Sequence, residues 1–192
     1  MPRGLVYWVL LTCLSTCLCT CSLLPTTDNA DSFDYLPLAQ PIGPSRRIVQ
    51  QIKAIWPGHQ ENMLCVLELD NRHIAIAGLS KEGVSLFNLN YDGNTVKLDK
   101  SPLLPTSFSP ELIVKDLQLV YWPLAELQKT LPQQWHLETG NNYRRLFFNN
   151  QSLMDVDYLE PDSTWPKTVS LINYRYHYQL YITTLSYETL SE

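Results

Sequence analysis

The sequence has few cysteines outside its first segment. Four of the five cysteines lie within the first 21 residues, and Cys65 is the only one that follows. A small secreted domain held by disulfides needs several cysteines along its folded part, so the sequence excludes that class. Cys65 lies in the apolar run Met63–Leu67, and we expect it to be a buried thiol rather than half of a disulfide. The folded part must therefore depend on a hydrophobic core.

Clusters of positive charge are absent as well. The chain has 14 Lys and Arg against 19 Asp and Glu, and its longest basic runs are the pairs Arg46-Arg47 and Arg144-Arg145. Nucleic acids and anionic membrane surfaces bind clustered positive charge, so we expect neither as a direct partner. With 45% hydrophobic and 17% charged residues, the composition is typical of a folded globular protein.

Motifs of catalytic and metal sites are also missing. The four histidines are dispersed and show no His-x-x-x-His or Cys-paired spacing that would hold zinc. There is no Gly-x-Ser-x-Gly nucleophile motif and no phosphate-binding or dinucleotide-binding glycine pattern. Asp155 and Asp157 could form a pair of carboxylates, but their alternation with Met154 and Val156 indicates the solvent-facing side of a strand. We therefore expect no catalytic residues, no metal and no cofactor.

No apolar run is long enough to cross a bilayer, which takes ~20 residues. The run from Leu5 to about Leu14 has instead the length of a signal-peptide core. The tetrapeptide Leu18-Cys19-Thr20-Cys21 resembles the lipobox of bacterial lipoproteins, in which the thiol of the Cys takes a lipid and its amine becomes the new N-terminus. We expect a signal peptide over residues 1–20 and lipidation of Cys21. A second frame ending at Cys17, and an ordinary secretory signal, are the alternatives.

The segment after Cys21 reads as a tether. Residues 22–45 are rich in Pro, Thr, Ser and Asp and show no sustained periodicity, so we expect residues 21–45 to form an anchor and a flexible linker. Ser22 follows the predicted lipidation site, and in sorted lipoproteins a residue other than Asp there implies the outer membrane. The expected location is the periplasmic face of the outer membrane, with the N-terminal lipid as the membrane contact.

From Arg46 onward the hydrophobic period is two, which is typical of strands. Met63, Cys65, Leu67 and Leu69 share one face, as do Ile74 and Ile76 in the next run and Val96 and Leu98 in a third. Turn residues separate the runs, among them the hairpin signal Asp92-Gly93. Residues 46–99 are therefore predicted to form an antiparallel meander of about five strands.

Helical spacing replaces the strand pattern at Ser109. Ser109 and Pro110 are typical of a helix start, and a helix to about Tyr121 is predicted. Trp122-Pro123 interrupts it, and a second helix follows until Pro132. Strands resume near Trp135 and continue to the end, so the sequence predicts one α+β domain over residues 46–192, with a single antiparallel sheet curled around a two-helix insert.

This arrangement resembles the LolA/LolB superfamily, whose members are incomplete β-barrels lidded by helices around an apolar cavity for acyl chains. The stretch from His73 to Leu98 is similar to the central hairpins of LolB. The Leu-x-Leu-x-x-Trp-Pro segment at Leu117–Pro123 and the strands Val169–Tyr174 and Tyr178–Leu185 are similar to LolB-like lipoproteins found beside aryl-polyene biosynthesis genes.

The resemblance implies that the concave face of the sheet, covered by the two helices, binds or helps transfer an acylated or polyene lipid, or a lipoprotein. It implies a periplasmic carrier protein as a further partner. The residues expected in the cavity or lid are Leu67, Leu69, Ile74, Ile76, Leu117, Trp122, Leu124, Leu127, Leu180 and Ile182. Leu79, on a turn from Gly78 to Gly83, matches the membrane-contact loop of LolB, although Lys81 and Glu82 make its tip polar.

Two interpretations of the interior stay open at this point. Trp56, Trp122, Trp135 and Trp165 suggest an apolar pocket, but core packing explains them equally well. An open cavity favours a lipid carrier. An interior filled by the protein's own side chains favours a non-catalytic scaffold lipoprotein of an envelope complex.

Overall fold

The computed structural model describes residues 38–104, 109–160 and 165–191. The predicted signal peptide, Cys21 and the tether up to residue 37 lie outside the described residues. Within the described residues, no helix is long and apolar enough to cross a membrane. Residues 38–45, which the sequence assigns to the tether, pack on the domain, and Ala39 is only 3% exposed.

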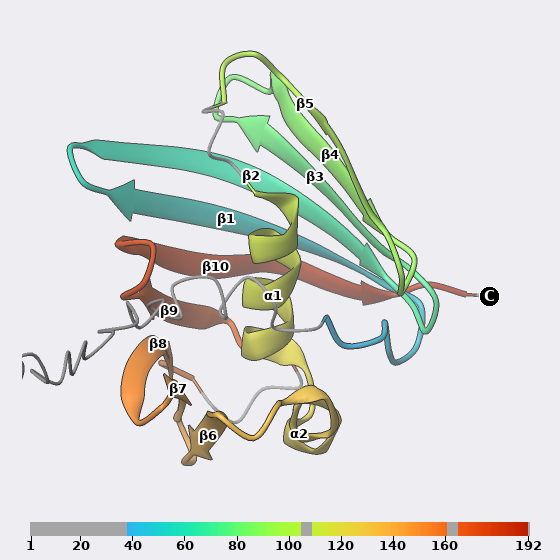
Figure 1. Cartoon of the computed structure of the whole chain (residues 1–192). Helices are drawn as coiled ribbons and strands as arrows, with labels where there is room; N and C mark the ends of the chain where they lie inside the picture. The colour runs from blue at the N-terminus through green and yellow to red at the C-terminus, as the bar shows by residue number, and fades with distance from the viewer. Residues whose placement is uncertain (1–37, 105–108, 161–164, 192) are drawn as a thin grey trace, which may run out of the picture. The chain divides into compact units, whose positions relative to one another are not determined.

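Two five-stranded meanders make up the domain (Figure 1). The first consists of β1 (Arg46–Trp56), β2 (His59–Leu69), β3 (Ile74–Ser80), β4 (Ser85–Tyr91) and β5 (Val96–Lys100). The second consists of β6 (Trp135–Thr139), β7 (Tyr143–Phe148), β8 (Gln151–Tyr158), β9 (Thr168–Asn173) and β10 (Tyr178–Thr189). Between them lie α1 (Pro110–Tyr121) and α2 (Leu124–Thr130). The predicted order of strands, two helices and strands is confirmed.

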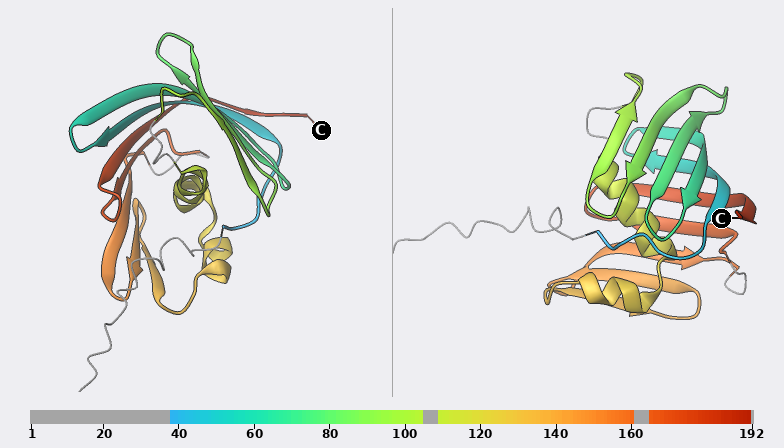
Figure 2. Two further views of the ribbon diagram at one scale, coloured as in Figure 1. Left: turned by 45° about the horizontal axis from the view of Figure 1, so that its top comes forward. Right: turned by 90° about the vertical axis from the view of Figure 1, so that its right-hand side faces the viewer.

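The meanders join edge to edge through their first and last strands. The strand order is β5-β4-β3-β2-β1-β10-β9-β8-β7-β6, all antiparallel, so β1 and β10 lie side by side at the centre of one open sheet. The two edge strands are β5 and β6, at opposite ends of the sheet. The connection between them, residues 101–134, must therefore cross one whole face. It does so as α1 and α2, and Figure 2 shows α1 end-on inside the curve of the sheet.

Strand register determines which side chains face α1. Leu69 pairs with Ile74, Ile74 with Tyr91, and Leu67 with Ile76, and all five are buried on the concave side. In the second meander the same side carries Val156, Leu171 and Val169, none of which is exposed. Because side chains alternate along a strand, the opposite side carries the polar residues. The predicted fold class, a curved antiparallel sheet that does not close and is covered on its concave face by two helices, is confirmed.

The helix boundaries follow the predicted signals. The Ser109 side chain accepts a hydrogen bond from the backbone N–H of Leu112, and Pro110 occupies the first turn. Trp122 adopts an extended conformation before Pro123, which ends α1 and starts α2.

The hairpin at Asp92 is longer than its Asp-Gly signal suggests. Four residues, Asp92 to Thr95, separate the paired Tyr91 and Val96. The Asp92 carboxylate accepts hydrogen bonds from the N–H groups of Asn94 and Thr95, at 2.9 and 2.8 Å. The bond from Thr95, and then that from Asn94, holds the pKa of Asp92 below its usual value. The side chain thus shapes the turn itself.

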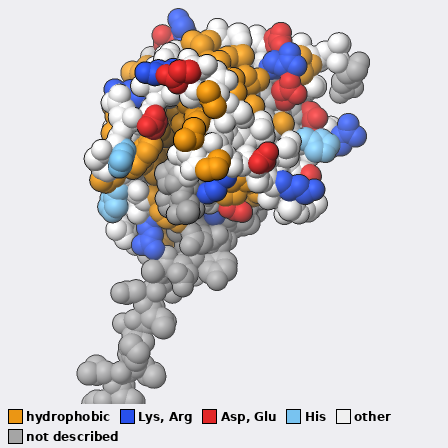
Figure 3. Space-filling view, turned by 90° about the horizontal axis from the view of Figure 1, so that it is seen from above, with side chains coloured by type: hydrophobic (Ala, Val, Ile, Leu, Met, Phe, Trp, Pro, Cys, Tyr) orange, Lys and Arg blue, Asp and Glu red, His pale blue; other side chains and the backbone are white. Residues whose placement is uncertain are grey.

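Charges of both signs are interspersed on the face shown in Figure 3, with hydrophobic side chains between them. This face therefore presents no continuous basic surface of the kind that nucleic-acid binding requires.

Cys65 lies at the centre of the first meander. It is 2% exposed and forms no disulfide, as predicted from its apolar run. Its partner on β3 is Gly78, which has no side chain, and the ring of Phe87 on β4 covers that gap. Burial raises the pKa of the Cys65 thiol to about 12, so the reactive thiolate is scarce at neutral pH.

We predict that Cys65 resists a thiol reagent in the folded protein and reacts only on unfolding, as peptide mass spectrometry after labelling would report. Cys65→Ser should lower the free energy of unfolding by about 1–3 kcal/mol, because it buries a hydroxyl in place of a thiol. Cys65→Ala, which introduces no polar atom, is the matched control. Rapid labelling of Cys65 in the native protein would contradict its burial.

Candidate functional site

Helix α1 is buried on nearly every side. Its seven residues from Val114 to Val120 are all buried, although Lys115, Asp116 and Gln118 among them are polar or charged. Polar groups in an interior are costly unless they are hydrogen-bonded, so α1 must carry its own set of partners.

The middle of α1 is bonded to the segment that leads into β1. The Gln118 side chain donates to the carbonyl of Ala39 at 2.6 Å and accepts from the N–H of Ala39 at 2.9 Å. The indole N–H of Trp122 donates to the carbonyl of Gln40 at 2.9 Å. Residues 39 and 40 therefore lie along α1 as a strap.

The last turn of α1 is bonded to the sheet. Arg144 on β7 donates from Nη1 to the carbonyl oxygens of Leu119 and Trp122, both at 2.7 Å. The Tyr158 hydroxyl on β8 donates to the carbonyl of Val120 at 2.6 Å. These carbonyls lie at the helix C-terminus, where no further turn can satisfy them and where a positive charge is favourable. Arg144 and Tyr158 thus cap α1 from the concave face.

An aromatic stack continues from this end of the helix. The rings of Tyr121 and Trp165 lie 4.1 Å apart and nearly parallel, and the Arg46 guanidinium lies 5.6 Å from the centre of the Trp165 ring. Gln50 donates to the Tyr121 hydroxyl at 2.7 Å. Burial is the main cause that raises the pKa of Tyr121, so its hydroxyl stays neutral.

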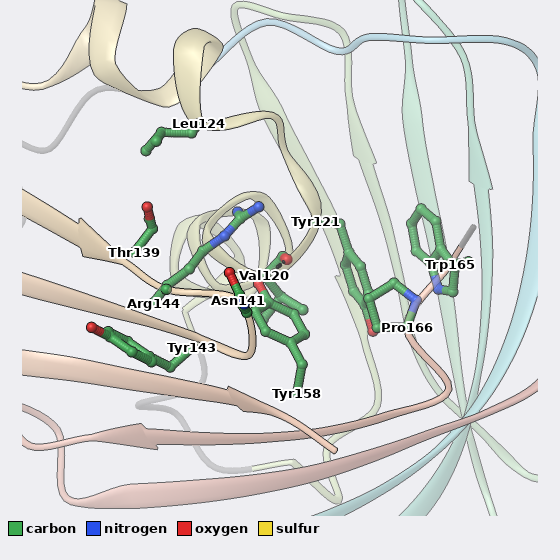
Figure 4. Close-up of a pocket in the computed structure, with 11 residues that line it drawn as sticks. Val120, Tyr121, Leu124, Thr139, Asn141, Tyr143, Arg144, Tyr158, Trp165 and Pro166 are labelled. Carbon is green, nitrogen blue, oxygen red and sulfur yellow. Dashed lines mark hydrogen bonds between the residues drawn. The ribbon is translucent and has the colours of Figure 1, made fainter. Parts of the chain in front are cut away.

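A pocket of about 370 Å³ lies where α1, α2 and the β6–β7 hairpin meet (Figure 4). Its apolar lining residues are Val120, Tyr121, Leu124, Trp165 and Pro166, and the others are Thr139, Gly140, Asn141, Tyr143, Arg144 and Tyr158. The volume lies near the lower end of the range for ligand pockets, roughly 300–1,000 Å³. It is large enough for a head group and the start of a chain, rather than for a whole long acyl chain.

Helix α2 has looser ties than α1. Only Leu127 of its seven residues is buried, and its side-chain hydrogen bonds in the described structure, Lys129 to Glu126 and Thr130 to the carbonyl of Leu127, stay within the helix. The break at Trp122-Pro123 therefore separates a helix anchored in the core from one that packs on its surface.

The predicted cavity and lid residues fall into three groups. Most are buried in the core: Leu67, Leu69, Ile74, Ile76, Leu117, Trp122, Leu127 and Ile182. Leu180 on β10 is half-buried opposite Ala54. Leu124 lines the pocket. Of the four tryptophans considered in the sequence, Trp165 lines the pocket, Trp122 and Trp135 are buried, and Trp56 is half-buried beside His59.

Leu79 lies within β3 on the convex side of the sheet. It pairs with Leu64 and is half-buried, and the turn that follows it consists of Lys81, Glu82, Gly83 and the 52% exposed Val84. Asp155 and Asp157 also point to the convex side, where Arg145 pairs with both at 3.3 and 2.6 Å. Neither carboxylate faces the pocket.

The polar lining of the pocket was not predicted. In the sequence, Arg144 stands out only as part of a basic pair. Because side chains alternate along a strand, Arg144 lies on the same side of β7 as the buried Leu146 and so faces the apolar side of the sheet. A charged residue at a position that alternation assigns to the apolar side was the one sign in the sequence that could have indicated this site. In the described part of the chain, no group of three or more His, Cys, Asp or Glu side chains is placed to hold a metal ion.

The fold and the pocket define a class: an open antiparallel α+β sheet with a ligand-sized pocket beside an interior helix. The chain belongs to the family described as "Protein of unknown function (DUF3261)", whose model matches residues 47–186. No curated protein matches the sequence significantly.

Two solved structures are similar to this chain in fold. A LolA superfamily protein from Nitrosomonas europaea is 9% identical with a TM-score of 0.46, and the match covers 83% of this chain and 90% of that one. A domain assigned to outer membrane lipoprotein sorting, from Vibrio parahaemolyticus, is 9% identical with a TM-score of 0.43 and coverages of 78% and 88%. These are similarities of fold at low identity.

Asp116 on α1 is buried with only one of its two carboxylate oxygens hydrogen-bonded to a described residue. Its Oδ2 accepts from the Tyr178 hydroxyl at 2.6 Å, but Oδ1 has no hydrogen-bond partner among the described residues. Burial raises the pKa of Asp116 to about 7, against the smaller opposing effects of Tyr178 and Lys115. The folded state therefore keeps a proton on Asp116 in a pH range where the unfolded chain has released it.

We predict that Asp116 makes the protein less stable as the pH rises from about 5 to about 8. The pKa of Asp116 is near 4 in the unfolded chain and about 7 in the folded protein. The stabilisation by the bound proton is therefore complete below about pH 4 and is lost as the pH rises through about 7. The loss should be on the order of 2–3 kcal/mol in the free energy of unfolding and should disappear in Asp116→Asn. Urea unfolding across this range would measure it, with exposed Asp99→Asn as control. An equal pH dependence in Asp116→Asn and the parent would contradict the prediction.

Proposed function

We propose that this protein is a lipid-anchored envelope protein that binds the apolar chain of a lipid or lipoprotein on the concave face of its sheet. The observation that carries the proposal is the pocket between α1, α2 and the sheet, whose lining combines apolar and polar residues. An amphiphile presents the same two kinds of surface, with its chain on one side and its head group on the other. An acylated lipid or a polyene lipid would fit this description.

The looser attachment of α2 supports a way for the chain to enter. The pocket is too small for a long chain, so the space must grow on binding. Displacing α1 would break bonds to Ala39, Gln40, Arg144 and Tyr178, whereas displacing α2 exposes chiefly Leu127. The lid would then be α2 alone, with its hinge at Trp122-Pro123.

A scaffold function is the second candidate. The observation that favours it is the burial of α1 from Val114 to Val120, which fills much of the concave side with the protein's own side chains. A scaffold would keep this interior closed and would bind no chain.

Lipid binding can be tested with Leu124→Trp, which adds bulk at the pocket wall on α2. The parent protein, released gently from its native membrane, should carry a lipid detectable by native mass spectrometry. Leu124→Trp should remain folded and lose most of that lipid, because the indole occupies its space. Leu185→Trp, at a 56% exposed position, is the matched control and should keep the lipid. A parent protein that carries no lipid would favour the scaffold.

The anchor has a separate test. We propose that Cys21 bears the lipid and that the protein lies on the periplasmic face of the outer membrane, where a periplasmic carrier protein could deliver cargo. Cys21→Ala should abolish labelling by a fatty-acid analogue and release soluble or unprocessed protein, because no thiol remains to take the lipid. Cys17→Ala should label normally. If labelling instead survives in Cys21→Ala and disappears in Cys17→Ala, the second frame is the correct one.

A further inference from the structure

Arg144 carries a positive charge inside the pocket without a carboxylate to balance it. No Asp or Glu is among the residues that line the pocket, and Arg144 forms no ion pair with any described residue. Burial lowers the pKa of its guanidinium, yet arginine stays protonated at neutral pH.

The bonds of Arg144 to α1 use only part of its hydrogen-bonding capacity. Both bonds leave from Nη1, toward the carbonyls of Leu119 and Trp122. A guanidinium has five N–H groups in a planar fork. The Nε and Nη2 groups donate to no described residue, and they belong to a side chain that lines the pocket (Figure 4).

The surroundings of Arg144 select the kind of anion. The Tyr158 ring lies 5.8 Å from the guanidinium, and its hydroxyl is already committed to Val120. Thr139, the direct cross-strand partner of Arg144, and Asn141 add neutral polar groups to the lining. Tyr121, Leu124 and Trp165 add apolar surface to the same pocket. A small inorganic anion would leave that apolar surface exposed to water, whereas an anionic amphiphile would cover it.

We propose that the Arg144 pocket binds the anionic head group of an amphiphile, a carboxylate or a phosphate, through the Nε and Nη2 groups of the guanidinium. Both head groups match the planar fork, because each offers two oxygens to parallel N–H donors. The chain of the amphiphile leaves along Leu124 and Tyr121 toward the concave face. This assignment rests on the proposed lipid-binding function and specifies the class of lipid.

The test uses three probes with one chain, namely dodecanol, dodecanoate and dodecyl phosphate, titrated below the concentrations at which they form micelles. Trp165 lines the pocket, so tryptophan fluorescence reports binding. Both anions should bind at least about tenfold more tightly than dodecanol, as a charge-assisted hydrogen-bond pair predicts. Tighter binding of dodecanoate would indicate a fatty acid, and tighter binding of dodecyl phosphate would indicate a phospholipid-like head group.

The decisive variant is Thr139→Glu, with Thr139→Gln as its matched control. A carboxylate at position 139 lies opposite Arg144 and competes for its free N–H groups, while the bonds of Arg144 to α1 stay intact. Thr139→Glu should lower the preference for both anions over dodecanol by about tenfold or more. Thr139→Gln adds the same bulk without the charge, so it should keep the parent's preference even if all three probes bind more weakly. Simple occlusion of the pocket would instead weaken all three probes equally in both variants.

The outcomes separate the two proposals. If dodecanol binds as tightly as the anions, or if Thr139→Glu and Thr139→Gln bind the anions equally, the head-group assignment is overturned and chain binding stands. If none of the three probes binds to the folded parent protein, the lipid-binding function fails and the head-group assignment fails with it.

Discussion

The burial of α1 is the constraint on which the rest of the structure depends. A helix that is buried along seven consecutive residues, three of them polar or charged, needs hydrogen-bond partners from all around it. The strap at Ala39 and Gln40 serves one side, Tyr178 a second, and Arg144 and Tyr158 the C-terminal end. These partners come from the segment before β1 and from three strands of the second meander, so the helix holds parts of the domain that are distant in sequence in a single arrangement.

The strand order explains why a helix lies there. Each meander forms from neighbours in sequence, but the sheet is completed only when β1 pairs with β10, more than a hundred residues away. That pairing places β5 and β6 at opposite edges, and the chain between them has to cross the concave face. A helix is a compact way to cross this face, since its backbone N–H and C=O groups bond to one another and need no partners from the sheet.

The pocket is a consequence of how α1 ends. Its last carbonyls need donors, and the sheet supplies a guanidinium and a phenol at inward positions that otherwise hold apolar side chains. Where these polar groups meet the start of α2, packing is incomplete and a pocket remains. The same residues that stabilise the helix thus create an amphiphilic site beside it. Whether the interior opens depends on α2, because α1 is hydrogen-bonded both to the strap and to strands of the second meander.

The sequence by itself determined the elements, because their signals are local. Alternation marked the strands, Ser109 and Pro110 marked the start of α1, Pro123 marked the break, and the apolar run around Cys65 predicted its burial. The turn after Tyr91 was placed correctly but is longer than its Asp-Gly pair indicated. The reason is that the Asp92 carboxylate accepts hydrogen bonds from both Asn94 and Thr95, which draws these two residues into the turn. Only the tertiary structure decided which cavity residues became core and which line a pocket. It alone brought Arg144, Tyr158 and Trp165 to the end of α1, because that meeting depends on long-range strand pairing and on the unsatisfied carbonyls of a helix distant in sequence.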